Sequence, residues 1–224
     1  MKKLSLAILL AIFSLAIQAQ KEFSISPITD SVKARMIGKS YPKEGASIAL
    51  SDLRYLRVKH YDAEGNVKNG EIVVNKAIAN DVIEIFKELY KIKYPIQSVK
   101  LIDDFNADDE VSMRHNNSSS FCYRVVKGSK RLSKHSRGMA IDINTLYNPC
   151  FVVDPTGKSA YKKGTLQPAT ADKYVSRKTK YPYTLTAEVV AIFKKHGFKW
   201  GGDWGTKKDY QHFEKYIFRQ NFEK

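Results

Sequence analysis

Four side chains in two short segments carry groups that could act together in catalysis. His135 and Asp142 lie seven residues apart in one segment, and Asp209 and His212 lie three residues apart in another, close to the C-terminus. Two imidazoles and one carboxylate can hold a zinc ion and leave one coordination position open. A second carboxylate close by can act as a general base. These residue types therefore suffice for metal-assisted hydrolysis, provided that the fold brings them together.

The setting of Asp142 indicates that its charge needs a partner. Ile141 and Ile143 flank it, and an ionised carboxylate in an apolar strand requires a cation or several hydrogen-bond donors. The odd spacing from His135 would put the two side chains on opposite faces of one continuous strand, but Gly138 allows a turn between them. A turn followed by a strand can bring both groups to one point. A structural aspartate held by backbone N–H groups remains the alternative.

The second pair is weaker evidence by itself, because Asp209 and His212 could be a surface acid beside a packed histidine. The two segments together make a stronger case. The chain has five histidines, and the other three, His60, His115 and His196, have no comparable setting. His196 is expected at the C-terminal end of a helix, where a cation is favoured for a different reason.

Both segments resemble the motifs of a known family. The sequence Ser133-Lys-His-Ser-Arg-Gly-Met-Ala-Ile-Asp142 resembles the S-x-H-x-x-G-x-A-x-D signature of the D-alanyl-D-alanine carboxypeptidase family of zinc peptidases, the VanY-like group of the lysostaphin/carboxypeptidase/hedgehog fold superfamily. Trp200-Gly-Gly-Asp-Trp204, followed by Asp209-Tyr-Gln-His-Phe213, resembles the second motif of this family. The resemblance covers roughly residues 75–218 and has both motifs in the family order.

The resemblance implies a role for each of the four residues. His135, Asp142 and His212 would be the zinc ligands, and Asp209 would be the base that activates the attacking water. Bound zinc lowers the pKa of that water to about 7 and polarises the scissile carbonyl. Carboxypeptidase-type members often carry Glu at the base position, whereas Asp occurs in members that resemble L-alanyl-D-glutamate endopeptidases. The identity of the cleaved bond therefore stays open.

The family also implies an arginine near the substrate, upstream of the first motif. Arg124 is the best match, and its guanidinium could hold a substrate carboxylate or carbonyl. A plain surface arginine is the alternative, and Arg114 is the second choice. Ser133 and Trp204 are further candidates for substrate binding, although a turn serine and a packed tryptophan would explain them equally well.

The expected elements are mixed, which predicts an α+β fold in which helices flank a small antiparallel sheet, as in hedgehog-type and D-Ala-D-Ala peptidases. Helical spacing of apolar residues predicts a helix from 76 to about 93 that ends before Pro95, and Thr186 can cap a second helix. Residues 103–120 and 144–183 are expected to be loops. Expected strands are 55–61, 70–74, 96–102, 121–126, 139–143, 198–204 and 210–213.

The N-terminal residues 1–19 are expected to be a secretory signal peptide. Lys2 and Lys3 precede an apolar run from Leu4 to Ile17, and a cleavage site follows; an uncleaved anchor is the alternative. Residues 20–74 are expected to form an N-terminal arm and hairpin, and residues 75–224 the zinc peptidase domain. The arm could be inhibitory, serve in docking or belong to the core.

The charge and the cysteine content limit the classes of binding partner and of metal site that we expect. The chain has 38 Lys and Arg against 23 Asp and Glu, a net charge of +15, so an exported form would be attracted to anionic polymers such as those of the cell wall. The cationic residues form no stripe with interleaved aromatics, which argues against nucleic acid. Cys122 and Cys150 are too few for a Cys-rich zinc site; they could pair or be two buried thiols.

Taken together, the sequence predicts a periplasmic or extracellular zinc metallopeptidase that acts on peptidoglycan stem peptides. The alternative is a non-catalytic, zinc-containing module of the same fold that binds the cell wall. Asp209 favours the enzyme, because a binding module has no need of a general base beside the metal. The sequence makes no prediction of the oligomeric state.

Overall fold

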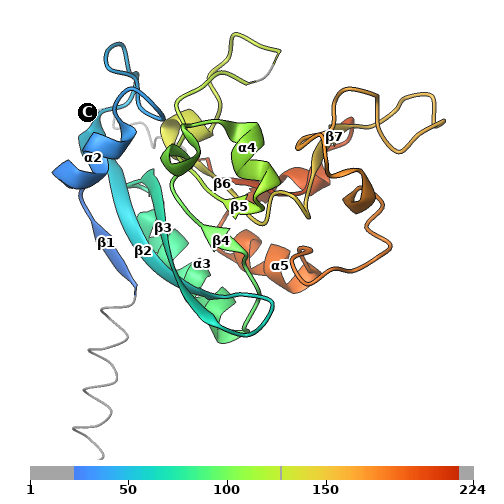
Figure 1. The fold of residues 1–224 in the computed structure, drawn as a ribbon, viewed down its shortest axis with the longest axis horizontal. Helices are drawn as coiled ribbons and strands as arrows, with labels where there is room; N and C mark the ends of the chain where they lie inside the picture. The colour runs from blue at the N-terminus through green and yellow to red at the C-terminus, as the bar shows by residue number, and fades with distance from the viewer. Residues whose placement is uncertain (1–22, 127, 217–224) are drawn as a thin grey trace, which may run out of the picture.

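The computed structural model describes residues 23–126 and 128–216, so the expected signal peptide, residues 1–19, lies outside the described residues. The fold is α+β, with several small sheets and few helices, as expected from the sequence. In Figure 1 helix α3 (Ala79–Lys91) lies against the N-terminal hairpin, and the later strands and helix α5 (Ala187–Lys195) lie to the right of the hairpin. No helix in the described part of the chain is long and apolar enough to cross a membrane.

The predicted hairpin is confirmed and is longer than expected. Strands β2 (Leu53–Tyr61) and β3 (Val67–Asn75) pair antiparallel, and β1 (Ser24–Ser26) adds a third strand beside β2. The Asp62 side chain closes the turn, because its Oδ1 accepts hydrogen bonds from the backbone N–H groups of Glu64 and Asn66.

The two main helices follow the periodicity that predicted them. Helix α3 (Ala79–Lys91) buries one apolar face, and α5 (Ala187–Lys195) begins at Thr186, whose hydroxyl accepts from the N–H of Val189. The shorter helices are α2 (Asp30–Met36), α4 (Asp109–Arg114) and the 3-10 turns η1 (Leu50–Asp52), η2 (Ile102–Phe105), η3 (His135–Arg137), η4 (Asp172–Tyr174) and η5 (Gly201–Asp203).

The remaining strands are short. An antiparallel sheet has the order β6-β10-β8, while β4 and β5 form a parallel pair and β7 and β9 an antiparallel pair. Their bounds are β4 (Ser98–Val99), β5 (Asn117–Ser118), β6 (Ala140–Asp142), β7 (Cys150–Val152), β8 (Lys199–Trp200), β9 (Lys207–Asp209) and β10 (His212–Glu214).

One apolar cluster connects the N-terminal hairpin with the strands that carry the motifs. Leu56 and Ile72 of the hairpin, Phe86 of α3, Ile141 of β6 and Phe213 of β10 are all buried in it. The division of the chain at residue 75 stays a prediction, but residues from both sides of this position share the cluster. The hairpin therefore belongs to the core that supports the motifs.

The structure corrects several local predictions, among them the loop expected at residues 144–183, which contains β7 and the turn η4. Residues 103–120 are not only loop, because Asp108 caps α4 through its side chain and β5 follows; a helix of six residues is too short to give a clear period. Residues 121–126 form no strand, since only Val125 makes a bridge there, with Leu132. Cys122 and Cys150, whose pairing the sequence left open, are both free and buried.

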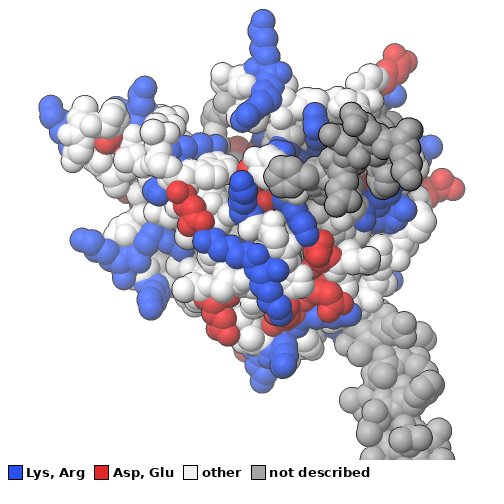
Figure 2. All heavy atoms as spheres, turned by 180° about the vertical axis from the view of Figure 1, so that it is seen from behind, with Lys and Arg blue, Asp and Glu red and all other residues white. Residues whose placement is uncertain are grey.

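Charged side chains of both signs are interspersed on the face of the molecule opposite to that in Figure 1. Figure 2 shows Lys and Arg side chains scattered across the reverse face, with Asp and Glu between them.

Candidate active site

The elements of the fold bring the two motifs together. Strands β6 and β10 pair antiparallel with His212 directly opposite Asp142, so both side chains lie on the same face of the sheet. His135 begins the turn η3, and Gly138 then adopts a left-handed conformation at φ 63°. This turn changes the direction of the chain before β6. The side chains of His135 and Asp142 therefore meet although their spacing is odd.

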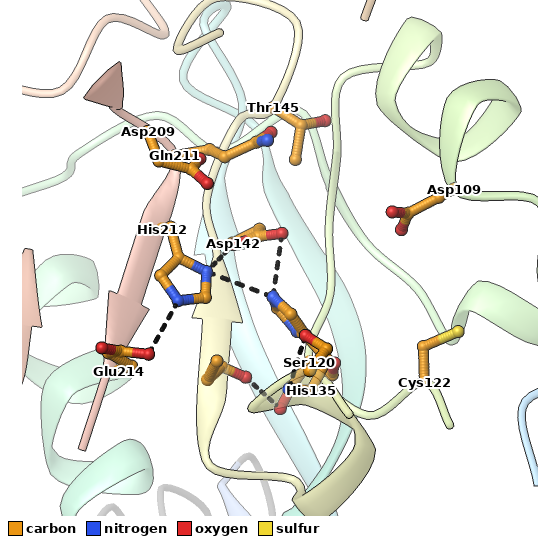
Figure 3. A network of polar contacts seen from close by, with 12 residues as sticks. Asp109, Ser120, Cys122, His135, Asp142, Thr145, Asp209, Gln211, His212 and Glu214 are labelled. Carbon is orange, nitrogen blue, oxygen red and sulfur yellow. Dashed lines mark hydrogen bonds and ion pairs between the residues drawn. The ribbon is translucent and has the colours of Figure 1, made fainter. Parts of the chain in front are cut away.

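The three expected ligands face one another (Figure 3). His135 Nε2 lies 3.2 Å from Asp142 Oδ2 and 3.2 Å from His212 Nδ1, and His212 Nδ1 lies 3.0 Å from Asp142 Oδ1. Ligands about 2.0–2.1 Å from a tetrahedral zinc ion would be separated by about 3.3 Å. Among the described residues, these side chains form the one group of three able to share a metal ion. The donor set and its spacing therefore fit zinc.

Each imidazole has a partner that orients it. His135 Nδ1 donates to the carbonyl oxygen of Ser120 at 2.6 Å, which leaves Nε2 facing the cluster. His212 Nε2 lies 3.4 Å from Glu214 Oε2, which leaves Nδ1 facing the cluster. All four side chains are buried or nearly so: His135 is 4%, Asp142 and His212 are 7%, and Glu214 is 8% exposed.

Strong electrostatic coupling runs through this group. Burial raises the pKa of Asp142, but the two imidazoles outweigh burial and lower it below its usual value. Burial also opposes the charged form of His212, yet its contacts with Asp142 and Glu214 raise its pKa to about 10. Burial of Glu214 is likewise outweighed by His212 and Tyr216, which lower its pKa to about 2. A metal ion would therefore displace a proton from His212.

Asp209 lies beside the cluster without joining it. It ends β9, which pairs with β7, and it is 8% exposed. Its Oδ2 is 3.4 Å from Lys207 Nζ, whereas its Oδ1 is buried and has no hydrogen-bond partner. Gly201 packs against it so closely that a Cβ at that glycine would lie 2.5 Å from the Asp209 carbonyl oxygen. An unpartnered carboxylate oxygen held this firmly suits a general base.

Arg124 forms an ion pair with Asp109, which the sequence did not predict. Its Nη2 lies 2.5 Å from Asp109 Oδ2 on α4, while its buried Nε has no partner. The Ser136 hydroxyl bonds to both the N–H and the carbonyl of Arg124 and so ties it to the turn that carries His135. Arg114, the second choice, pairs instead with Glu110 and is 51% exposed at its side chain.

The other two candidates occupy different settings. The Ser133 hydroxyl accepts a hydrogen bond from the His135 N–H at 3.2 Å, which is the geometry of a turn serine. The Trp204 ring lies 5.5 Å from the His212 ring, centroid to centroid, and is half-buried. Trp204 is therefore placed to form a wall beside the cluster. The assignment of all these residues to substrate, metal or catalysis stays a prediction.

Ser120, Asp109 and Glu214 are contacts of the site that the motifs did not predict. Glu214 could have been found, because it follows His212 by two residues in a strand and so shares its face. Ser120 acts through its backbone carbonyl, so its side chain gave no signal. Asp109 lies in the region predicted to be a loop, and nothing local connects it with Arg124.

Comparison with known proteins agrees with this arrangement. No solved structure matches the chain. A family model described as D-alanyl-D-alanine carboxypeptidase matches residues 127–215, and the mixed α+β fold is compatible with that family. The matched segment contains both motifs, and with them His135, Asp142, Asp209 and His212. Over this segment the chain is therefore similar to the D-alanyl-D-alanine carboxypeptidase family of peptidases.

Proposed function

We propose that the protein is an exported zinc-dependent peptidase that cleaves the stem peptides of peptidoglycan. The observation that carries this proposal is the geometry of His135, Asp142 and His212, with Asp209 beside them. A metal site without catalysis would not require a buried carboxylate oxygen left without a partner, because such an atom is costly to bury.

Each of these residues has a separate role in the proposed reaction. His135, Asp142 and His212 hold the zinc ion, which supplies Lewis-acid polarisation of the scissile carbonyl when bound. Asp209 accepts a proton at Oδ1 from the attacking water and returns it to the leaving amine. Arg124 donates to a substrate carboxylate or carbonyl and orients it. Trp204 forms an apolar wall that limits the access of water.

The substrate is proposed at the level of a peptidoglycan stem peptide, with two possible bonds. Removal of a terminal D-Ala and cleavage within the stem, after the first L-Ala, give products of different mass. Digestion of purified muropeptides with the zinc-loaded protein, followed by mass spectrometry, distinguishes them. Asp209→Ala serves as the control. Undiminished activity after removal of zinc by a chelator would contradict the mechanism.

A non-catalytic cell-wall-binding module of the same fold is the second candidate. It predicts that muropeptides bind to the zinc-loaded protein and are recovered intact. The partnerless Oδ1 of Asp209 favours the enzyme over this module. Retention on peptidoglycan without the release of any fragment would reverse that order.

Export to the periplasm or the outside of the cell is proposed from residues 1–19. The basic start and the apolar run from Leu4 to Ile17 support a signal peptide. The net charge of +15, which falls to +13 when Lys2 and Lys3 are removed with the signal peptide, suits an anionic wall. N-terminal sequencing of the protein recovered from cells tests the proposal, with Gln20 as the expected first residue. A protein that retains Met1 would contradict cleavage.

A further inference from the structure

Glu214 is a buried carboxylate that the mechanism above does not use. It is 8% exposed and lies two residues after His212 in β10, so both side chains point to the same face. Its Oε2 lies 3.4 Å from His212 Nε2, and its Oε1 accepts a hydrogen bond of 2.7 Å from the Tyr216 hydroxyl. Both oxygens therefore have partners, and the carboxylate is fixed in one orientation.

Two lysines contact the Tyr216 ring. Lys134 Nζ lies 3.6 Å from the centroid of the Tyr216 ring, and Lys199 Nζ lies 5.1 Å from it. Such cation–π contacts favour one position of the ring. Since Lys134 directly precedes His135, this chain of contacts connects the segment of one expected ligand with the segment of another.

We propose that Glu214 is a positioning residue for the metal, which keeps the proton of His212 on Nε2 and turns Nδ1 towards His135 and Asp142. The inference rests on the proposed zinc site. A neutral imidazole has one free nitrogen lone pair, and the hydrogen bond made by the other nitrogen decides which one it is. Carboxylates in this position also increase the basicity of the ligating nitrogen.

The charge of Glu214 distinguishes it from the partner of the other histidine. His135 donates to the neutral backbone carbonyl of Ser120, whereas His212 faces an ionised side chain. A buried divalent cation requires negative charge nearby. Asp142 supplies one such charge directly and Glu214 a second through His212. Loss of the Glu214 charge should therefore weaken metal binding even if the fold is retained.

The test is the zinc affinity of Glu214→Gln, measured by competition with a chromophoric chelator. Gln keeps the shape and can still accept from Nε2, but it carries no charge. We expect zinc affinity to fall about 10–100-fold. The matched control is Glu88→Gln, because Glu88 Oε1 contacts His196 Nε2 at 2.7 Å in a similar Glu–His pair outside the metal cluster. This variant should bind zinc with wild-type affinity.

Two further measurements separate positioning from simple loss of structure. The thermal midpoint of the metal-free variant reports folding, and the visible spectrum of the cobalt-substituted protein reports the ligand geometry, which Glu214→Gln should alter. If Glu214→Gln does not fold, Tyr216→Phe takes its place. That variant keeps the ring and loses only the hydroxyl bond to Glu214, and its zinc affinity should fall roughly two- to tenfold.

The outcomes point to different conclusions. A wild-type protein that does not bind zinc would overturn the proposed function and this inference with it. If the wild-type protein binds zinc and a folded Glu214→Gln variant binds it with equal affinity, the inference is overturned but the proposed function is not. If that variant does not fold, unchanged affinity in Tyr216→Phe has the same consequence.

Discussion

Asp209 differs in position from the three expected ligands, and its proposed role rests on this difference. It lies outside the cluster of donors, and its Oδ1 is buried without a partner. We expect Asp209→Ala to retain zinc and to lose about 10²–10⁴-fold in kcat/KM, which is the usual contribution of a general base. Metal content and muropeptide hydrolysis should be measured on the same preparation. Loss of the metal from this variant would contradict the assignment.

His212 should behave differently, because it is expected to bind the metal directly. His212→Ala removes one of three protein ligands and leaves Glu214 without its imidazole partner, while Asp142 keeps only His135. We expect both zinc and activity to be lost. Metal analysis after gel filtration checks this, with His115→Ala as the control, since His115 is exposed and outside the cluster. Zinc retained at full stoichiometry in His212→Ala would exclude His212 as a ligand.

At this scale the sequence predicted the residues that the motifs name, and the structure brings those residues together. It did not predict their partners. The contacts of Arg124 with Asp109 and of His135 with the Ser120 carbonyl depend on how separate segments pack, and no spacing along the chain encodes them. Only Glu214 could have been predicted, because it lies in the same strand as its partner His212.

Among the elements, the turn η3 depends on a close approach between the first motif and the hairpin. Gly138 has φ 63°, and a Cβ there would lie 2.6 Å from the backbone nitrogen of Asn75 at the end of β3. Asn75 also donates from its backbone N–H to the Gly138 carbonyl. We expect Gly138→Ala to lower the free energy of unfolding by about 1–3 kcal/mol and also to weaken zinc binding, because His135 begins the same turn.

Urea unfolding and chelator competition measure the two effects of Gly138→Ala. Gly65→Ala is the matched control: Gly65 has φ 82° but nothing within 4 Å of an added Cβ. That variant should show only the cost of the left-handed backbone and no change in zinc affinity. Equal effects of the two variants would mean that the contact with β3 is unimportant.

The hairpin turn predicts a pH dependence of stability. Burial raises the pKa of Asp62, but hydrogen bonds from Asn66 and an ion pair with Lys68 outweigh it and lower the pKa to about 2. The unfolded value is about 3.9, so the unfolded chain binds more protons between these values. The stabilisation by Asp62 is therefore present above about pH 4 and is lost as the pH falls towards 2.

We expect Asp62→Asn to be less stable than wild type at pH 7 and the difference to shrink below about pH 4. Thermal midpoints of both proteins measured from pH 7 to pH 2 check this. A difference that stays constant over the whole range would show that the Asp62 charge does not contribute.

Periodicity predicted those elements that are long enough to display it. The hairpin, α3 and α5 bury one face each, and their apolar residues repeat accordingly. Helix α4 and strand β9 span six and three residues, so neither completes enough repeats to be recognised. Yet β9 ends at Asp209, and α4 begins at Asp109, the partner of Arg124. The elements that shape the site are thus the least visible in the sequence.

In the molecule as a whole, the pairing of β6 with β10 brings the two motifs together, because it joins residues 70 positions apart in the chain. Zinc would add a direct link between the same two segments. Since the unfolded chain does not hold the three ligands together, binding should stabilise the folded state by about 4 kcal/mol at a free zinc concentration 1,000 times the Kd. For a chain of this size that corresponds to a rise in Tm of roughly 10 °C.

Calorimetry of the metal-free and zinc-loaded protein measures this shift. Magnesium should not reproduce it, because that ion prefers six oxygen ligands in an octahedron and the cluster offers two imidazoles and one carboxylate. His212→Ala should show no zinc-dependent shift, whereas Asp209→Ala should show the full one. A wild-type Tm that does not respond to zinc would mean that these segments are held together by the β6–β10 pairing and the His–Asp contacts alone.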